Sequence, residues 1–181
     1  GSIRDHSTVR DLLLSLSPPR IREAAAAVDA LELRLMDDDT EPVQLAYAHA
    51  LAEYADAGGY DQEVVFDACC DAALGIAYDQ AKWREVNTLS GGEQKRLALE
   101  LRVRGPDEVL LLDEPDIYLD VPGKRWLEEQ LRATQKTVLL VSHDRELLAQ
   151  AATQIAALEL GAGGNTLWVH GGGWATFVDA R

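Results

Sequence analysis

Two stretches decide the fold class of this 181-residue chain: Val109-Leu110-Leu111-Leu112-Asp113-Glu114-Pro115 and Val138-Leu139-Leu140-Val141-Ser142-His143. Each begins with a short continuous apolar run, which is typical of a strand buried in a parallel sheet. A helical pattern over residues 122 to 132 lies between them. Strand, helix and strand within about thirty residues form a βαβ unit. The sequence therefore predicts an α/β fold.

Titratable side chains follow both predicted strands directly. Asp113 and Glu114 come after the first strand, and Ser142 and His143 come after the second. Because parallel crossovers are right-handed, the two pairs should meet at the carboxyl edge of the sheet, where α/β folds bind ligands. The simpler alternative is that acidic residues merely end a strand at solvent. Two strands that both end in titratable residues favour a site.

A second candidate site lies at the start of the helix predicted over residues 94 to 104. Ser90-Gly91-Gly92-Glu93 precedes it, and Ser90 with Glu93 has the spacing of a capping box. The two glycines carry no side chains, so a phosphate could approach the free N–H groups and the positive end of the helix dipole. Plain capping is the alternative.

The two halves of the chain differ in pattern and charge. Helical periodicity covers residues 9 to 16, 19 to 36, 42 to 57 and 60 to 74, and the first 86 residues hold 17 acidic and 7 basic side chains. Two more strands are predicted over residues 155 to 160 and 166 to 170, around a turn that contains Gly161, Gly163, Gly164 and Asn165. We therefore expect an all-helical subdomain over residues 1 to 86 and an α/β core over residues 87 to 181.

Composition narrows the function classes. The net charge of −14 opposes direct contact with nucleic acid or anionic lipid. The apolar runs are too short for a membrane helix, and no signal peptide pattern opens the chain, so we expect a cytoplasmic protein without membrane insertion. The two cysteines, Cys69 and Cys70, are adjacent and suit neither an ordinary disulfide nor a zinc site. The four tryptophans are predicted to be packing anchors.

The motifs, taken in order, resemble those of the ATP-binding cassette (ABC) ATPases. Residues 89 to 96 match the signature motif, residues 109 to 115 the Walker B strand with its glutamate, Leu119-Asp120 the D-loop, and residues 141 to 145 the switch histidine. Ser142-His143-Asp144-Arg145, the tail at residues 171 to 177 and the helical half look like the ABC-F proteins. That family has two cassettes in one chain and acts on ribosomes.

The resemblance implies a partial P-loop NTPase-like parallel sheet with helices, plus an all-helical subdomain, that uses ATP and Mg²⁺. Asp113 would hold Mg²⁺ through water, Glu114 would act on the attacking water, and His143 would contact the γ-phosphate. The signature residues would close over an ATP held by the opposite cassette, and Asp120 would couple the two sites. The signature residues are Ser90, Gly91, Gly92 and Glu93. Such roles suit phosphoryl transfer, in which positioning and charge stabilisation dominate.

The phosphate-binding loop of that family, G-x-x-x-x-G-K-[ST], does not occur in this sequence. Gly123-Lys124 is followed by Arg125 and lacks the first glycine. By the resemblance the chain is the second half of a first cassette, inactive alone and dependent on a Walker A-bearing half or a second cassette. We also expect the strand edge at residues 137 to 141 to be bare and to support a homo-oligomer.

Two other functions stay open. The chain could be a non-catalytic interaction module whose acidic helices bind a translation component or partner protein. It could also be a soluble nucleotide-binding subunit of an ABC transporter. If the chain is part of an ABC-F protein, the ribosome would be a partner of the intact protein.

Overall fold

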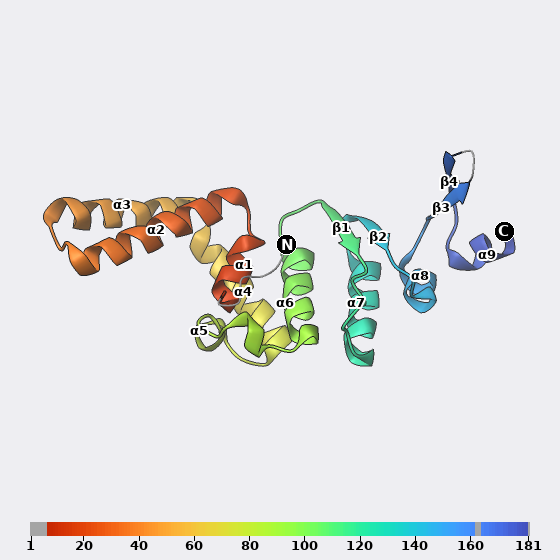
Figure 1. The fold of residues 1–181 in the computed structure, drawn as a ribbon, viewed down its shortest axis with the longest axis horizontal. Helices are drawn as coiled ribbons and strands as arrows, with labels where there is room; N and C mark the ends of the chain where they lie inside the picture. Colours follow the sequence, from red (N-terminus) through yellow and green to blue (C-terminus); the bar gives the residue numbers. More distant parts are fainter. Residues whose placement is uncertain (1–6, 162–163, 181) are drawn as a thin grey trace. The chain divides into compact units, whose positions relative to one another are not determined.

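The computed structural model describes residues 7–161 and 164–180, in two compact units, Gly1–Pro106 and Asp107–Arg181 (Figure 1). The first unit is built of helices: α1 (Val9–Ser15), α2 (Pro19–Asp37), α3 (Glu41–Asp56), α4 (Gly59–Leu74), α5 (Tyr78–Ala81), a 3₁₀ turn (Val86–Thr88) and α6 (Gly91–Arg104). These helices confirm the helical periodicity of the sequence. None of the helices in the described residues has both the length and the apolar character needed to span a membrane.

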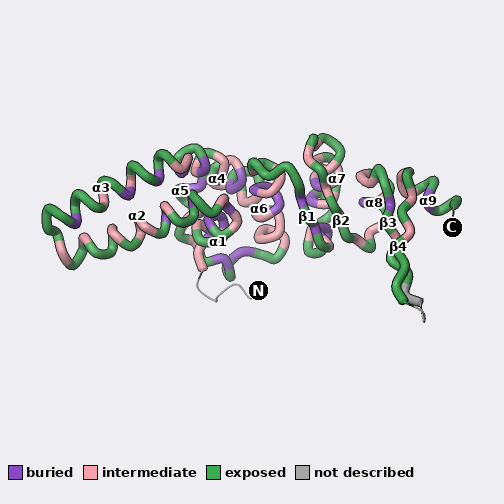
Figure 2. The backbone as a smooth tube through the Cα atoms, turned by 90° about the horizontal axis from the view of Figure 1, so that it is seen from above, coloured by how far each residue is buried: buried purple, intermediate pink, exposed green. Residues whose placement is uncertain are grey.

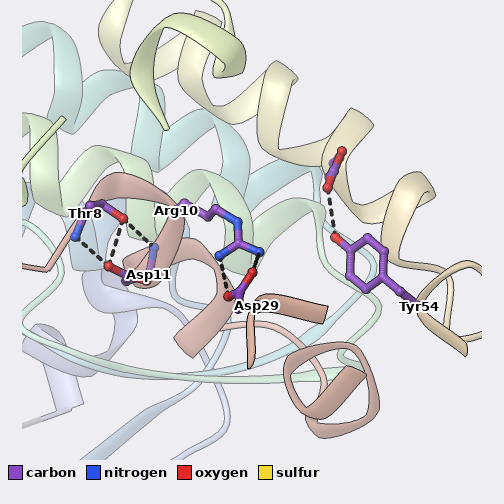
Figure 3. Close-up of polar contacts among 6 residues, drawn as sticks. Thr8, Arg10, Asp11, Asp29 and Tyr54 are labelled. Atoms are coloured by element: carbon purple, nitrogen blue, oxygen red, sulfur yellow. Dashed lines mark hydrogen bonds and ion pairs between the residues drawn. The ribbon is translucent and has the colours of Figure 1, made fainter. Parts of the chain in front are cut away.

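The core of the first unit lies among α1, α4, α5 and α6. Leu13, Phe66 and Leu97 are fully buried there, because their helices turn one apolar face inward. The antiparallel pair α2 and α3 lies mostly exposed in Figure 2. The Arg10 guanidinium donates to both oxygens of the Asp29 carboxylate at 2.8 Å, and this bidentate ion pair links α1 to α2 (Figure 3).

The division between the two compact units lies after Pro106. The reason is α6, which packs against α4 and places Leu97 and Leu101 in the helical core. The amphipathic pattern of residues 94 to 104 predicts the helix and its apolar face. It does not say whether a sheet or another helix covers that face.

The second unit contains the predicted βαβ element: β1 (Val109–Asp113), α7 (Val121–Ala133) and β2 (Thr137–Val141). β1 and β2 pair in parallel from Val109↔Thr137 to Asp113↔Val141. Then follow α8 (Arg145–Ala151), the antiparallel hairpin of β3 (Ile155–Gly161) and β4 (Gly164–His170), and α9 (Trp174–Ala180). Part of the predicted turn between these two strands, residues 162–163, lies outside the described residues.

The exposure of alternate residues in β1 and β2 corrects the prediction of two buried strands. Leu110 and Leu112 are buried, whereas Leu111 is 74% and Leu139 is 60% exposed. In a strand, alternate residues point to opposite faces, so Leu111 and its register partner Leu139 lie on one uncovered face. On the opposite face Leu110 and Leu112 are buried, and α7, which lies beside the two strands in Figure 1, contributes the fully buried Leu127.

The hairpin and α9 share an aromatic cluster. Phe177 is buried, and its ring centroid lies 5.4 Å from that of Trp168 and 5.5 Å from that of Trp174. Aromatic pairs at such distances stabilise packing beyond the area they bury. These two tryptophans are packing anchors, as predicted.

We expect both thiols of the folded chain to be inert. Cys69 and Cys70 are completely buried in α4, and burial raises the pKa of Cys69 to about 12 and that of Cys70 to about 11. Because the thiolate is the reactive form, a disulfide reagent at pH 8 should react slowly with native protein and stoichiometrically with both thiols in concentrated urea. Rapid reaction of either thiol in the native protein would contradict this burial.

Candidate functional site

The candidate residues of the second unit gather where β1 and β2 end. Asp113 is level with Val141 in the register, and the Glu114 N–H donates to the Val141 carbonyl at 2.8 Å, which extends the pairing by one residue. Asp113-Glu114 and Ser142-His143 therefore leave the sheet at the same edge. This is the arrangement that the sequence predicts from a right-handed parallel crossover.

Glu114 and His143 are in direct contact at this edge. The Glu114 Oε1 lies 3.2 Å from the His143 Nε2, and the side chain of Glu114 is 23% exposed while that of His143 is 95% exposed. An exposed imidazole fixed at one nitrogen by a carboxylate keeps its other side available to a ligand. The pair joins two side chains that lie 29 positions apart in the sequence.

The backbone of Glu114 is strained, with φ at +44°. A residue with a side chain pays roughly 1 to 2 kcal/mol in this left-handed region, which is why glycine usually occupies it. The turn is held by buried Pro115 and by an Ile117 N–H that donates to the Glu114 carbonyl at 3.3 Å. Strain of this kind is concentrated at functional sites, where the surrounding structure enforces it.

Asp113 presents an exposed carboxylate at the end of β1. Among the described residues no group of three or more His, Cys, Asp and Glu side chains could hold a metal ion. Mg²⁺ in phosphate sites usually takes one or two carboxylates and completes its shell with phosphate oxygens and water. Asp113 suits such a shared site, and a cage built from protein ligands alone does not fit these residues.

A polar network that the sequence analysis did not predict supports the loop after β2. The Ser142 Oγ donates to buried Asp116 at 2.8 Å and accepts from the Asp144 N–H at 3.0 Å. The Lys124 Nζ donates to Asp144 at 2.7 Å and lies 3.8 Å from Asp116. His143 stands between Ser142 and Asp144, so this network fixes both flanks of the histidine.

Lys124 and Asp144 alter each other's protonation. The hydrogen bond from Lys124 holds the pKa of Asp144 below its usual range, and the bond to Asp144 raises the pKa of Lys124. Asp144 also caps α8 by accepting from the Glu146 and Leu147 N–H groups. In the sequence, the only signal at Lys124 is that Gly123-Lys124 matches part of the phosphate-binding loop motif. Lys124 lies one turn into α7, and it can reach Asp144 only after β2 and α8 have formed.

Asp120 has a local structural role in this structure. It is the N-cap of α7, and its Oδ1 accepts from the Gly123 N–H at 2.9 Å. A Cβ atom at position 123 would lie 2.9 Å from that oxygen and 3.3 Å from the Leu119 side chain, so the close approach requires glycine. The coupling role of Asp120 stays a prediction.

The signature residues lie in the first unit, at the start of α6. The capping box is confirmed, because the Ser90 N–H donates to Glu93 at 2.7 Å and the Glu93 N–H donates to the Ser90 Oγ at 3.2 Å. The bond from the Ser90 N–H lowers the pKa of Glu93. Gly91 and Gly92 occupy the first turn, where N–H groups have no preceding intrahelical acceptor.

We expect Lys124→Met to lower the free energy of unfolding at pH 7 by about 0.5 to 1 kcal/mol, since the Lys124 side chain is 39% exposed and its ion pair is partly screened. The depressed pKa of Asp144 stabilises the fold above its unfolded value of about 3.9 and is lost as pH falls through the folded value. The raised pKa of Lys124 gives stability below about pH 10.4 that is lost as pH rises through its folded value.

Urea titrations should therefore show a gap between variant and parent at pH 7 that closes below about pH 4. Arg125→Met, which removes an exposed cation from the same helix, is the matched control and should leave stability unchanged at both pH values. A gap that is equally large in acid would rule out the Lys124–Asp144 pair as its source.

Comparison with known proteins shows which proteins the chain is similar to. No family model matches it. An antibiotic resistance protein of Mycobacteroides abscessus is 60% identical over 181 residues, which are all of this chain and 33% of the relative. The tylosin resistance ATP-binding protein TlrC of Streptomyces fradiae is 35% identical over 97% of this chain and 31% of the relative. The chain thus spans about a third of the length of these relatives.

Among solved structures, the archaeal ribosome recycling factor aABCE1, in complex with the ribosomal stalk protein aP1, matches 99% of this chain. Its TM-score is 0.53, its identity is 21% and 28% of that chain is covered, so the likeness concerns the fold. It bears out a P-loop NTPase-like fold of the ABC ATPase type. The homologues of this chain are ABC and ABC-F ATP-binding proteins, and the chain matches a portion of them.

Proposed function

We propose that this chain supplies the signature motif, the Walker B carboxylates and the switch histidine of an ABC-F-type ATPase, and that it hydrolyses ATP only with a Walker A-bearing segment. The observation that carries the proposal is the contact of strained Glu114 with His143, 3.2 Å apart at the carboxyl end of two parallel strands. The tylosin resistance ATP-binding protein, which aligns with 97% of this chain, supports it.

In the proposed reaction Glu114 accepts a proton from, or polarises, the water that attacks the γ-phosphate. His143 contacts that phosphate through its exposed imidazole, and its contact with Glu114 sets the orientation of the ring. The Lys124 network holds the loop on both sides of His143. Phosphoryl transfer depends mostly on such positioning, so a rigid loop is a direct contribution to rate.

Asp113 is the residue proposed to hold Mg²⁺ through water, and the bound ion would neutralise charge on the phosphate oxygens. Ser90, Gly91, Gly92 and Glu93 would close over the nucleotide of an opposite cassette. Their first-turn N–H groups and the α6 dipole favour a phosphate there. Asp120 would couple the two sites from its position at the start of α7.

The proposed partner of the intact protein is the ribosome. Support comes from the resemblance to the ABC-F proteins and from the name of one solved structural neighbour, a ribosome recycling factor in complex with a ribosomal stalk protein. The net charge of −14 argues that this part of the protein contacts protein components and does not contact RNA directly. A role as an interaction module is the second candidate, favoured by the largely exposed α2–α3 pair (Figure 2).

The decisive variant is Glu114→Gln, which keeps the shape of the side chain and removes its charge. We expect it to lower ATP turnover by about a hundredfold or more, because general-base catalysis contributes on that order. It should be measured in a chimera in which this chain replaces the aligned 181 residues of the Mycobacteroides abscessus relative. Glu129→Gln, on the exposed face of α7, is the matched control and should hydrolyse ATP at the parental rate.

Nucleotide binding distinguishes the two candidate functions. For an ATPase, the Glu114→Gln chimera should retain ATP while hydrolysis stops. If the parental chimera neither binds nor hydrolyses ATP but the relative does, the interaction module becomes the better description. The isolated chain should not bind Mg²⁺-ATP more tightly than about 1 mM, since its sequence has no phosphate-binding loop.

The uncovered face of β1 and β2 is proposed to be the place where a Walker A-bearing segment or a second copy packs. Apolar residues cluster there, with Val109, Leu111, Leu139 and Val141 all more than half exposed. An apolar face beside an unpaired strand edge favours association.

We expect light scattering at micromolar concentration to give a mass above that of one chain, and Leu139→Lys to reduce it to the monomer. Lysine in the middle of this face opposes its burial. Leu167→Lys, at an equally exposed position on the β3–β4 hairpin, should leave the mass unchanged. A monodisperse monomer of the parent chain would contradict the proposed association.

A further inference from the structure

A pocket of about 180 Å³ lies in the first unit, away from the candidate phosphate residues in the sequence. It is formed where α1, α2, α3 and α4 meet, beside the segment after α5. Its walls combine two kinds of side chain, three aromatic rings and three carboxylates: Tyr54, Tyr60, Trp83, Asp29, Glu32 and Glu63. Arg10 is the single basic residue in the lining.

The residues that line the pocket carry a net negative charge. Arg10 donates to both oxygens of Asp29 at 2.8 Å, so this pair is neutral as a unit (Figure 3). Glu32 and Glu63 have no basic partner among the residues that the structure describes. The bond that Glu63 accepts comes from the buried Tyr54 hydroxyl at 3.0 Å. The pocket therefore has an excess of negative charge against an apolar floor that includes buried Ala25.

The tyrosine hydroxyl reinforces this polarity. Burial, followed by the negative charge of Glu63, raises the pKa of Tyr54, so the hydroxyl stays protonated and continues to donate to Glu63. In Figure 3 the hydroxyl of Tyr54 points along the dashed line to its carboxylate partner. The Glu63 carboxylate is thus held in position without a countercharge.

Aromatic rings line the pocket, and the face of such a ring attracts cations. Tyr54 and Tyr60 meet edge to face, with centroids 5.2 Å apart and planes at 81°. Trp83 is 65% exposed, which corrects the expectation that it is a packing anchor. The guanidinium carbon of Arg10 lies 5.8 Å and the Lys82 Nζ lies 5.9 Å from the centre of its ring. The ring thus interacts with two cations of this chain, and each of them is paired with its own carboxylate, Asp29 for Arg10 and Asp79 for Lys82.

We propose that this pocket binds an organic cation, an alkylated ammonium or a guanidinium group. Cation–π attraction to Trp83 and the tyrosines would act together with the carboxylates of Glu32 and Glu63. The volume equals that of about six water molecules, which suits a cationic head group with a few carbon atoms. A metal ion is disfavoured, because no group of three or more His, Cys, Asp and Glu side chains among the described residues could hold one.

The same chemistry has two sources, a free organic cation and a lysine or arginine side chain of another polypeptide. The 181-residue chain should therefore be titrated with tetramethylammonium chloride and, separately, with N-acetyl-arginine amide. Sodium chloride at matched ionic strength and the neutral analogue tert-butanol are the reference titrations. Calorimetry gives affinity, and the indole N–H resonance of Trp83, assigned by its loss in Trp83→Phe, reports the place of binding.

We expect saturable binding of at least one organic cation, with a shift of the Trp83 resonance that sodium chloride and tert-butanol do not produce. Tighter binding of the arginine derivative identifies a polypeptide side chain as the ligand source, and tighter binding of tetramethylammonium identifies a free cation. Absence of saturable binding by both, or equal binding of tert-butanol, would overturn the proposal.

Charge-removing variants test the assigned residues. Glu32→Gln and Glu63→Gln should each weaken binding by about threefold, the effect of one solvent-exposed charge pair. Glu32 is exposed, so its variant carries no risk to folding, and Gln at position 63 still accepts from Tyr54. Glu23→Gln, an exposed glutamate on the same helix outside the pocket, is the matched control. Equal weakening by the control would show non-specific electrostatics and overturn the site. These outcomes do not depend on ATP hydrolysis.

Discussion

The parallel pairing of β1 with β2 is the constraint on which the candidate catalytic residues depend. Its register brings Asp113 level with Val141, and the Glu114 N–H adds one more hydrogen bond beyond the last strand residue. Shifting this register by one residue would turn every side chain to the other face and separate Glu114 from His143. The α7 crossover makes that register possible, because it returns the chain in the same direction.

Polar side chains at the same edge of the sheet also hold the loop after β2 in place. Ser142 and Asp144 flank His143. Asp116, which precedes α7, holds Ser142, and Lys124 in α7 holds Asp144. The crossover helix thus does more than connect two strands, since it also supplies the cation that fixes the loop after the second one. Rigid elements and loops tied to them position reacting groups more accurately than free loops.

Much of this arrangement could be predicted from the sequence, because it follows from local patterns. Apolar runs ended by Asp113 and by Ser142 indicated the strands, and the spacing of Ser90 and Glu93 indicated a capping box. What could not be predicted depends on partners far apart in the chain. The Lys124–Asp144 bond, the packing of α6 on α4 and the exposure of Leu111 all depend on which surfaces meet after folding. The sequence predicts Trp83 to be a packing anchor, whereas the structure shows its ring exposed and beside Arg10 and Lys82.

The left-handed backbone of Glu114 places stability in conflict with the proposed chemistry at a single position. Glycine would remove the steric cost of that conformation, and asparagine would reduce it, but neither carries a carboxylate. A laboratory selection for thermostable variants of this protein would therefore enrich such substitutions at position 114 unless it also selected for turnover. In the proposed ATPase a residue without a carboxylate at this position could not act on water, so the proposed function sets an upper limit on the stability of this loop.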